Sequence, residues 1–169
     1  WDDLSYYYAP EISALSFNFN VVDLEVIADG EPGTVKKYVM DSFAMIAFFE
    51  DEPGADRVAL ILKSLMDRKA KAYMSVINWG EIYYNTMREQ GVETAEKVIE
   101  QLKQYPVELV DADQKLTYEA AKFKSRYKIA YADCFAAALS HRLNAVIVTG
   151  DPEFKKPGGK YSIQWLGTE

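Results

Sequence analysis

The stretch that most constrains the fold is residues 131–154, with the sequence YADCFAAALSHRLNAVIVTGDPEF. In its first half, small and apolar residues recur at helical spacing, namely Ala132, Ala136, Leu139 and Leu143. The apolar run that follows, 145–148, is typical of a strand covered on both faces of a sheet. A parallel strand delivers the next residue to the carboxyl edge of its sheet, where open α/β folds bind their ligands. This stretch therefore predicts a helix, a buried strand and a carboxylate, Asp151, at that edge.

The rest of the chain alternates short apolar runs with amphipathic segments. The runs predict strands at 36–40, 72–76, 107–110 and 145–148, with a fifth at 161–166. Helices are expected at 43–49, 55–69, 78–87 and 92–104, followed by one that Asp111 or Asp113 caps and that ends at Tyr127. This alternation predicts an α/β fold in three layers, with a mainly parallel central sheet flanked by helices.

Composition excludes several classes of protein. A chain of 169 residues corresponds to one domain with room for an appendage, and its 49% hydrophobic and 14% aromatic content argues against a disordered chain. The single cysteine, Cys134, excludes an internal disulfide and fits a reducing compartment. Because no apolar run approaches the ~20 residues of a membrane span and no signal peptide is recognisable, we expect a cytoplasmic protein without membrane contact.

The net charge of −7 is unevenly distributed. Residues 1–34 carry seven acidic residues and no Lys or Arg, whereas residues 35–169 carry the other 19 acidic residues and all 19 basic ones. The larger part is therefore neutral, and the acidity of the whole chain does not argue against a nucleic-acid partner. We expect two units: an acidic N-terminal extension, 1–34, with strands near 17–21 and 24–27, and a domain, 35–169. The extension is either a peripheral hairpin or appended sequence without a role, or an acidic, aromatic flap over a cationic groove.

Four carboxylates fall where a predicted strand meets a predicted helix: Asp41, Glu81, Asp133 and Asp151. Each has a structural explanation when taken singly. Asp41 suits a helix N-cap, Asn78 and Glu81 have the spacing of a capping box, Asp133 would favour the positive end of a helix, and Asp151 precedes a proline in a turn.

Together, these structural explanations are weaker, because all four acids are expected at one edge of one sheet. Carboxylates crowded there would repel one another unless a cation lay among them. Oxygen ligands without nearby His or Cys suit Mg²⁺ or Mn²⁺. A pair of such ions can cleave a phosphodiester, one activating the attacking water and the other stabilising the leaving oxygen.

Residues 35 to about 156 resemble a PIN domain, and within that family the VapC-type toxin ribonucleases. The segments that carry the resemblance are KKYVMDS, SVINWGEIYY and YADCFAAALSHRLNAVIVTGDPEF, the last with its 18-residue gap between two acids. The resemblance implies a metal-binding quartet of Asp41, Glu81, Asp133 and Asp151. Asp41 and Asp133 would carry most of the metal binding, and the other two would complete the cage, hold a second ion or orient water. Ser42 and Thr149 match the hydroxyls that accompany the quartet in relatives.

The resemblance further implies an endoribonuclease that depends on Mg²⁺ or Mn²⁺, a cognate antitoxin that restrains it, and a homodimer. Family members usually begin where Val35 stands here, so residues 1–34 depart from the pattern. Antitoxins of this system often insert a basic residue among the acids, and residues 1–34 contain none.

Other residues were weighed for a role in the site. Three lysines follow Asp151 and suit either phosphate contact or a solvated loop: Lys155, Lys156 and Lys160. Three aromatic residues flank Glu81 and suit the core or a dimer surface better than base stacking: Trp79, Tyr83 and Tyr84. His141 has no nucleophile to pair with, and Cys134 is interpreted as core packing.

Two alternatives to a PIN nuclease were considered. A phosphatase of the haloacid-dehalogenase class also begins with Asp after its first strand, but it needs a second Asp at the position of Phe43. A non-catalytic PIN-like subunit that binds RNA or a protein is the other alternative, and the intact quartet argues against it.

Overall fold

The structure is a computed structural model, and it describes residues 35–157 and 161–167. The predicted extension 1–34, with its strands near 17–21 and 24–27, and the predicted role of Lys160 therefore lie outside the described residues. The division of the chain at residue 34 stays a prediction.

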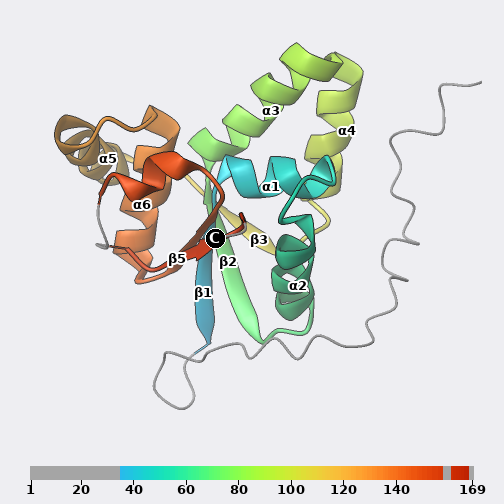
Figure 1. Cartoon of the computed structure of the whole chain (residues 1–169), viewed down its shortest axis with the longest axis horizontal. Coiled ribbons are helices and arrows are strands. Elements are labelled where there is room, and N and C mark those ends of the chain that lie inside the picture. Colours follow the sequence, from blue (N-terminus) through green and yellow to red (C-terminus); the bar gives the residue numbers. More distant parts are fainter. Residues whose placement is uncertain (1–34, 158–160, 168–169) are drawn as a thin grey trace, which may run out of the picture. The chain divides into compact units, whose positions relative to one another are not determined.

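The centre of the domain is a parallel sheet of five strands in the order β3-β2-β1-β4-β5 (Figure 1). The strands are β1 (Lys36–Met40), β2 (Ala70–Ser75), β3 (Val107–Val110), β4 (Val146–Thr149) and β5 (Ile163–Trp165). Every predicted strand within the described residues is present, the fifth included, with bounds that shift by two residues at most.

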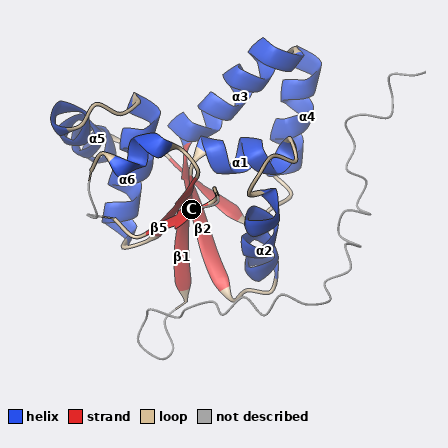
Figure 2. Cartoon of the chain, viewed as in Figure 1, coloured by secondary structure: helices blue, strands red, loops and turns tan. Residues whose placement is uncertain are grey.

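Six α-helices cover the two faces of this sheet in the described part of the chain (Figure 2). They are α1 (Ser42–Phe49), α2 (Ala55–Met66), α3 (Val76–Gln90), α4 (Val92–Leu102), α5 (Gln114–Arg126) and α6 (Tyr131–Leu143), followed by a short 3-10 helix, η2 (Pro152–Lys155). The predicted three-layer α/β fold is confirmed. Among these helices, none has the length and apolarity needed to cross a bilayer.

The alternation of β1 shows how the sheet separates two cores. Tyr38 and Met40 pack into one apolar cluster with residues of α1 to α4. Val39, between them in sequence, packs into a second cluster with residues of α5 and α6. Successive side chains of a strand point to opposite faces, so a single buried strand supplies both layers.

Two predictions about helix starts are resolved by the structure. The capping box of Asn78 and Glu81 is wrong, because α3 begins earlier: Ser75 is its N-cap and accepts a hydrogen bond from the Ile77 N–H at 3.1 Å. Ser is as good an N-cap as Asn, and Ser75 lies directly at the end of β2. For α5, the N-cap is Asp113 rather than Asp111, and its carboxylate accepts from the Leu116 N–H at 2.6 Å.

Gly150, between Thr149 and Asp151, lies against the aromatic ring of Phe43. A Cβ at Gly150 would stand 2.9 Å from Cζ of that ring, so the turn that leads from β4 to Asp151 has no room for a side chain. We expect Gly150→Ala to lower the free energy of unfolding by about 1–3 kcal/mol through overpacking, measured by urea denaturation.

Gly80 is the matched control for this substitution, because a Cβ there meets nothing within 4 Å and the residue lies inside α3. Gly80→Ala is expected to raise stability by up to about 1 kcal/mol through helix propensity. Equal effects of the two substitutions would show that the contact with Phe43 does not limit the turn.

Candidate metal centre

The carboxyl edge of the sheet brings together residues that are far apart in the sequence. Asp41 follows β1 directly, and its N–H still bonds to the Val148 carbonyl of the neighbouring β4 at 3.2 Å. Glu81 projects from α3, the helix that leaves β2. Asp133 is in the first turn of α6, which begins at this same edge because it leads back into β4.

Three carboxylates meet at this edge. Asp41, Glu81 and Asp133 each offer an oxygen, and the three oxygens lie within 4.8 Å of one another. Asp41 and Asp133 are buried, with 1% and 4% of their surface exposed, and Glu81 is partly buried. Three acids of a predicted quartet therefore form one compact cluster.

Hydrogen bonds hold the Asp41 carboxylate from several elements. Its Oδ1 accepts from the Ser42 N–H at 2.8 Å, and its Oδ2 accepts from the Thr149 hydroxyl at 2.9 Å. The Ser42 hydroxyl donates to Oε2 of Glu81 at 2.5 Å, and the Tyr84 hydroxyl donates to the other oxygen of Glu81 at 3.0 Å. Ser42 and Thr149 are thus in contact with the acids, while their role in the site stays a prediction.

Asp151 lies beside this cluster rather than in it. Its Oδ1 accepts from the Glu153 N–H at 2.7 Å, as the N-cap of η2, and its own N–H donates to the Thr149 hydroxyl at 3.0 Å. Its negative charge still acts on the cluster by raising the pKa of both Asp41 and Asp133. Its place among the metal ligands therefore stays a prediction.

The arrangement of strand-end acids can be compared with known families. The model of the PIN domain matches residues 38–160, most of the chain. The chain belongs to the PIN domain family. A comparison with curated protein sequences found no significant match.

Solved structures of PIN proteins share the fold. VapBC2 from Rickettsia felis bound to promoter DNA aligns with a TM-score of 0.59 at 16% identity, over 76% of this chain and 97% of that chain. VapBC-1 from nontypeable Haemophilus influenzae gives 0.57 at 22%, over 77% and 98%. VapC20 from Mycobacterium tuberculosis, described as a sarcin–ricin loop cleaving toxin, gives 0.57 at 16%, over 73% and 95%. At these identities the likeness establishes a shared fold.

Burial and the neighbouring acids raise the pKa values of two carboxyl groups in the site, those of Asp41 and Asp133. Burial above all, together with the charge of Glu81, raises the pKa of Asp41 to about 7, although the hydrogen bond from Thr149 acts in the opposite direction. Burial, followed by the charges of Asp41 and Asp151, raises the pKa of Asp133 to about 8. No cationic side chain is among the causes of either shift. When the carboxyl groups ionise, their negative charge is therefore not balanced by one of these causes.

The cluster fits a divalent cation on three observations. The donors are all carboxylate oxygens, which is the set that hard divalent cations prefer. The three oxygens are close enough together for one ion to reach each of them. Oδ2 of Asp133 is buried and has no hydrogen-bond partner, although a buried charged oxygen is costly to leave unpaired. An acidic triad suited to a metal is therefore present, and its oxygen set does not distinguish Mg²⁺ from Mn²⁺.

Asn78 is the residue of this site that sequence reasoning missed. It is fully buried in the first turn of α3, and its Nδ2 donates to Oδ1 of Asp41 at 3.1 Å and to the Ala132 carbonyl at 3.3 Å. Because both partners are acceptors, the amide has one orientation, and it ties Asp41 to the residue before Asp133. Its Oδ1 is buried without a partner. The signal in the sequence was Ser75, a better-placed N-cap that leaves Asn78 free to turn inward.

Two of the three lysines predicted for RNA contact, Lys155 and Lys156, have contacts within the domain. The Lys155 ammonium stands 5.6 Å from the centre of the Trp165 ring. Lys156 Nζ donates to the Lys128 carbonyl at 2.6 Å and pairs with Glu153 at 2.5 Å. Lys160 lies outside the described residues. The structure leaves contact with RNA untested for all three.

The other residues considered for the site lie in or against a hydrophobic core, or at the surface. Trp79 and Tyr83 are partly buried against the core on the α1 to α4 face, whereas Tyr84 is 47% exposed. Cys134 is fully buried in the other core, as expected, and burial raises the pKa of its thiol to about 11, which keeps it un-ionised. Phe43 packs beside Gly150, so an apolar ring occupies the position where a haloacid-dehalogenase phosphatase needs its second Asp.

Proposed function

We propose that this PIN domain is an endoribonuclease of the VapC type that uses Mg²⁺ or Mn²⁺ to hydrolyse phosphodiester bonds in RNA. The observation that carries the proposal is the cluster of Asp41, Glu81 and Asp133, in which Oδ2 of Asp133 is buried without a hydrogen-bond partner. Family membership supports nuclease activity, and the choice of RNA rests on the resemblance to VapC toxins.

The four acids would have different roles in the site, according to how deeply each one is buried. Asp41 and Asp133, the buried pair, would be the main ligands of a divalent ion, and Glu81 and Asp151 would complete the cage or orient water. A bound ion would supply a Lewis acid that stabilises the charge developing on the phosphate. Thr149 and Asn78 hold the two oxygens of Asp41, so that this carboxylate is oriented before any ligand arrives.

The proposal includes partners. Two of the similar structures are VapBC complexes, and VapC20 is described as a sarcin–ricin loop cleaving toxin. By analogy, the chain would be the toxin of a toxin–antitoxin pair, restrained by a cognate antitoxin and assembled as a homodimer. It would act in the cytoplasm, where RNA is abundant and its single cysteine would stay reduced.

Cleavage of a fluorogenic RNA in Mn²⁺ tests the function, with the full chain compared with a chain that starts at Val35. We expect both proteins to cut, and EDTA to abolish cutting. If the shorter chain cuts at least about tenfold faster, residues 1–34 act as the inhibitory flap, because their seven acids would compete with RNA phosphates. Equal rates would show that the extension is an appendage.

The non-catalytic alternative is separated by an RNA-binding measurement in EDTA. Binding of RNA without cleavage by either folded protein in Mg²⁺ or Mn²⁺ would overturn the proposed nuclease and favour a binding subunit. Cleavage that persists in EDTA would overturn the metal dependence.

A further inference from the structure

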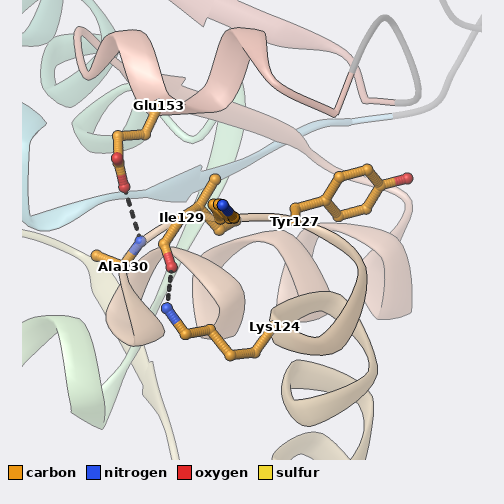
Figure 3. Close-up of a pocket in the computed structure, with 6 residues that line it drawn as sticks. Lys124, Tyr127, Ile129, Ala130 and Glu153 are labelled. Carbon is orange, nitrogen blue, oxygen red and sulfur yellow. Dashed lines mark hydrogen bonds between the residues drawn. The ribbon is translucent and has the colours of Figure 1, made fainter.

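A hollow lies near the acidic cluster, between the end of α5, the start of α6 and η2 (Figure 3). Its volume is about 340 Å³, and we call it the lysine hollow. It is lined by Lys124, Tyr127, Lys128, Ile129, Ala130 and Glu153. None of these six residues was among the predicted site residues.

The lysine hollow is adjacent to the metal centre. Ala130 is the N-cap of α6, and Asp133 stands in the first turn of that helix. Glu153 follows Asp151 by two residues, and its charge contributes to the raised pKa of Asp133. A polymer bound with one unit at the acids would therefore have a neighbouring unit at this hollow.

Ammonium groups surround the hollow in fixed positions. Lys124 Nζ donates to the Ile129 carbonyl at 2.5 Å (Figure 3), and Lys156 Nζ donates to the Lys128 carbonyl at 2.6 Å. An ammonium has three N–H donors, so Lys124, which one carbonyl anchors, keeps two donors for a ligand, and Lys156, which also pairs with Glu153, keeps one. Lys128 is exposed, and among the described residues its ammonium has no partner.

The hollow already accommodates an anionic group of the chain itself. The Glu153 carboxylate accepts from the Ala130 N–H at 2.8 Å through Oε2 (Figure 3). Its other oxygen, Oε1, pairs with Lys156 at 2.5 Å. Anionic oxygens are favoured in front of a helix N-terminus, which is where Ala130 stands. The contacts of Glu153 thus show that the hollow offers both an N–H donor and a cation to an anionic oxygen.

The helix that ends at the hollow, α5, and the loop after it form a basic segment of the chain. Residues 114–130 contain a single acidic residue, Glu119, and five exposed basic ones: Lys115, Lys122, Lys124, Arg126 and Lys128. A local excess of four positive charges contrasts with the zero net charge of residues 35–169, to which this segment belongs. A basic strip of this kind beside a nuclease site is the electrostatic footprint of a nucleic-acid backbone.

We propose that the lysine hollow binds a phosphodiester of the RNA strand next to the one that is cut, with Lys128 and Lys124 as its cationic contacts. This inference rests on the proposed function, because it takes RNA to be the substrate. Glu153 restrains the affinity of this subsite, since its carboxylate occupies part of the anion position.

Binding of a labelled single-stranded RNA to the full chain, measured by fluorescence anisotropy in EDTA over a series of KCl concentrations, tests the inference. The association constant K falls with salt, and loss of one phosphate contact makes the plot of log K against log salt less steep by about 0.7 for a single strand. This corresponds to about fivefold weaker binding at 0.1 M salt. We expect this result for Lys128→Gln. Glu153→Gln should bind RNA more tightly, because the amide can still accept from the Ala130 N–H while the competing charge is gone.

Lys97→Gln is the matched control, because Lys97 is an exposed lysine of α4 with no assigned contact to the hollow. It should bind RNA like the unmodified chain. If Lys128→Gln and Glu153→Gln also bind like the unmodified chain, and that chain binds and cuts RNA, the hollow is not a phosphate subsite while the proposed function stands. If the unmodified folded chain neither binds nor cuts RNA, both proposals are overturned.

Discussion

Asp133→Asn is expected to reduce RNA cleavage in Mn²⁺ by about 1,000-fold and to leave the fold intact. Asp133 contributes one of the three clustered carboxylates, and its Oδ2 is buried without a hydrogen-bond partner, so this substitution removes both a ligand oxygen and a charge from the site. Electrostatic stabilisation by a bound ion contributes several kcal/mol to the barrier, and about 4 kcal/mol corresponds to a factor of about 1,000.

The stability of this variant separates a lost ligand from a damaged fold. Asn has nearly the shape of Asp and carries no charge to be desolvated in a site that is 4% exposed. In EDTA at pH 8, Asp133→Asn should therefore unfold at the same temperature as the unmodified chain or higher. Mn²⁺ should raise the melting temperature of the unmodified chain and have little effect on the variant.

Asp67→Asn is a suitable control, because Asp67 is an exposed acid that pairs with Lys69 at 3.3 Å, outside the acidic cluster. It should retain full cleavage and the full response to Mn²⁺. An Asp133→Asn protein that cuts RNA at the normal rate would refute the assignment of the acidic cluster as the catalytic site.

The layout of this domain was predictable because it depends on short-range patterns. The unbroken run 145–148 identified β4, and the alternation of runs and amphipathic segments identified a parallel sheet. Once the sheet is parallel, acids that follow a strand share an edge with acids at the start of a helix that leads into the next strand, so the sequence predicted the neighbourhood of Asp41, Glu81 and Asp133. Those predictions needed only the period of each element and the direction of each strand.

The directions in which individual side chains point were harder to predict from the sequence. Whether Asn78 caps α3 or enters the site depends on where the helix begins, and Ser75 decides that three residues earlier. Asp151 satisfies the Glu153 N–H, a local contact that competes with joining the other acids. The lysine hollow depends on two backbone carbonyls: that of Ile129 accepts from Lys124, and that of Lys128 accepts from Lys156. Such choices are made by tertiary contacts and leave no period in the sequence.

The second large effect is expected in the pH dependence of stability. In EDTA, the free energy of unfolding should fall as the pH rises from about 5 to about 8.5, by at least about 3 kcal/mol. The folded pKa values of Asp41 and Asp133, about 7 and about 8, lie above the ordinary value of 3.8 that applies in the unfolded chain. At a pH between the unfolded and the folded pKa of such a group, the folded protein keeps a proton that the unfolded chain has released. The free energy of unfolding then falls by about 1.4 kcal/mol per pH unit for each of these groups.

Urea denaturation between pH 5 and pH 8.5 measures this slope. This pH range excludes the titration of Asp113. The hydrogen bond with Arg142 lowers the pKa of Asp113 to about 2, so its contribution to the free energy of unfolding is lost only as the pH falls below about 4. Asp133→Asn, which lacks one of the two titrating groups, should give a shallower slope than the unmodified chain.

A divalent ion should change the same curve in a way that connects it to the site. Since the ion competes with protons for the carboxylates, Mn²⁺ should stabilise the protein far more at pH 8 than at pH 5. Stability that stays flat or rises with pH in EDTA would mean that the acids are balanced by charges within the protein. The buried oxygen of Asp133 would then have no need of a cation, and the physical argument for a metal centre would fail even if the fold is that of a nuclease.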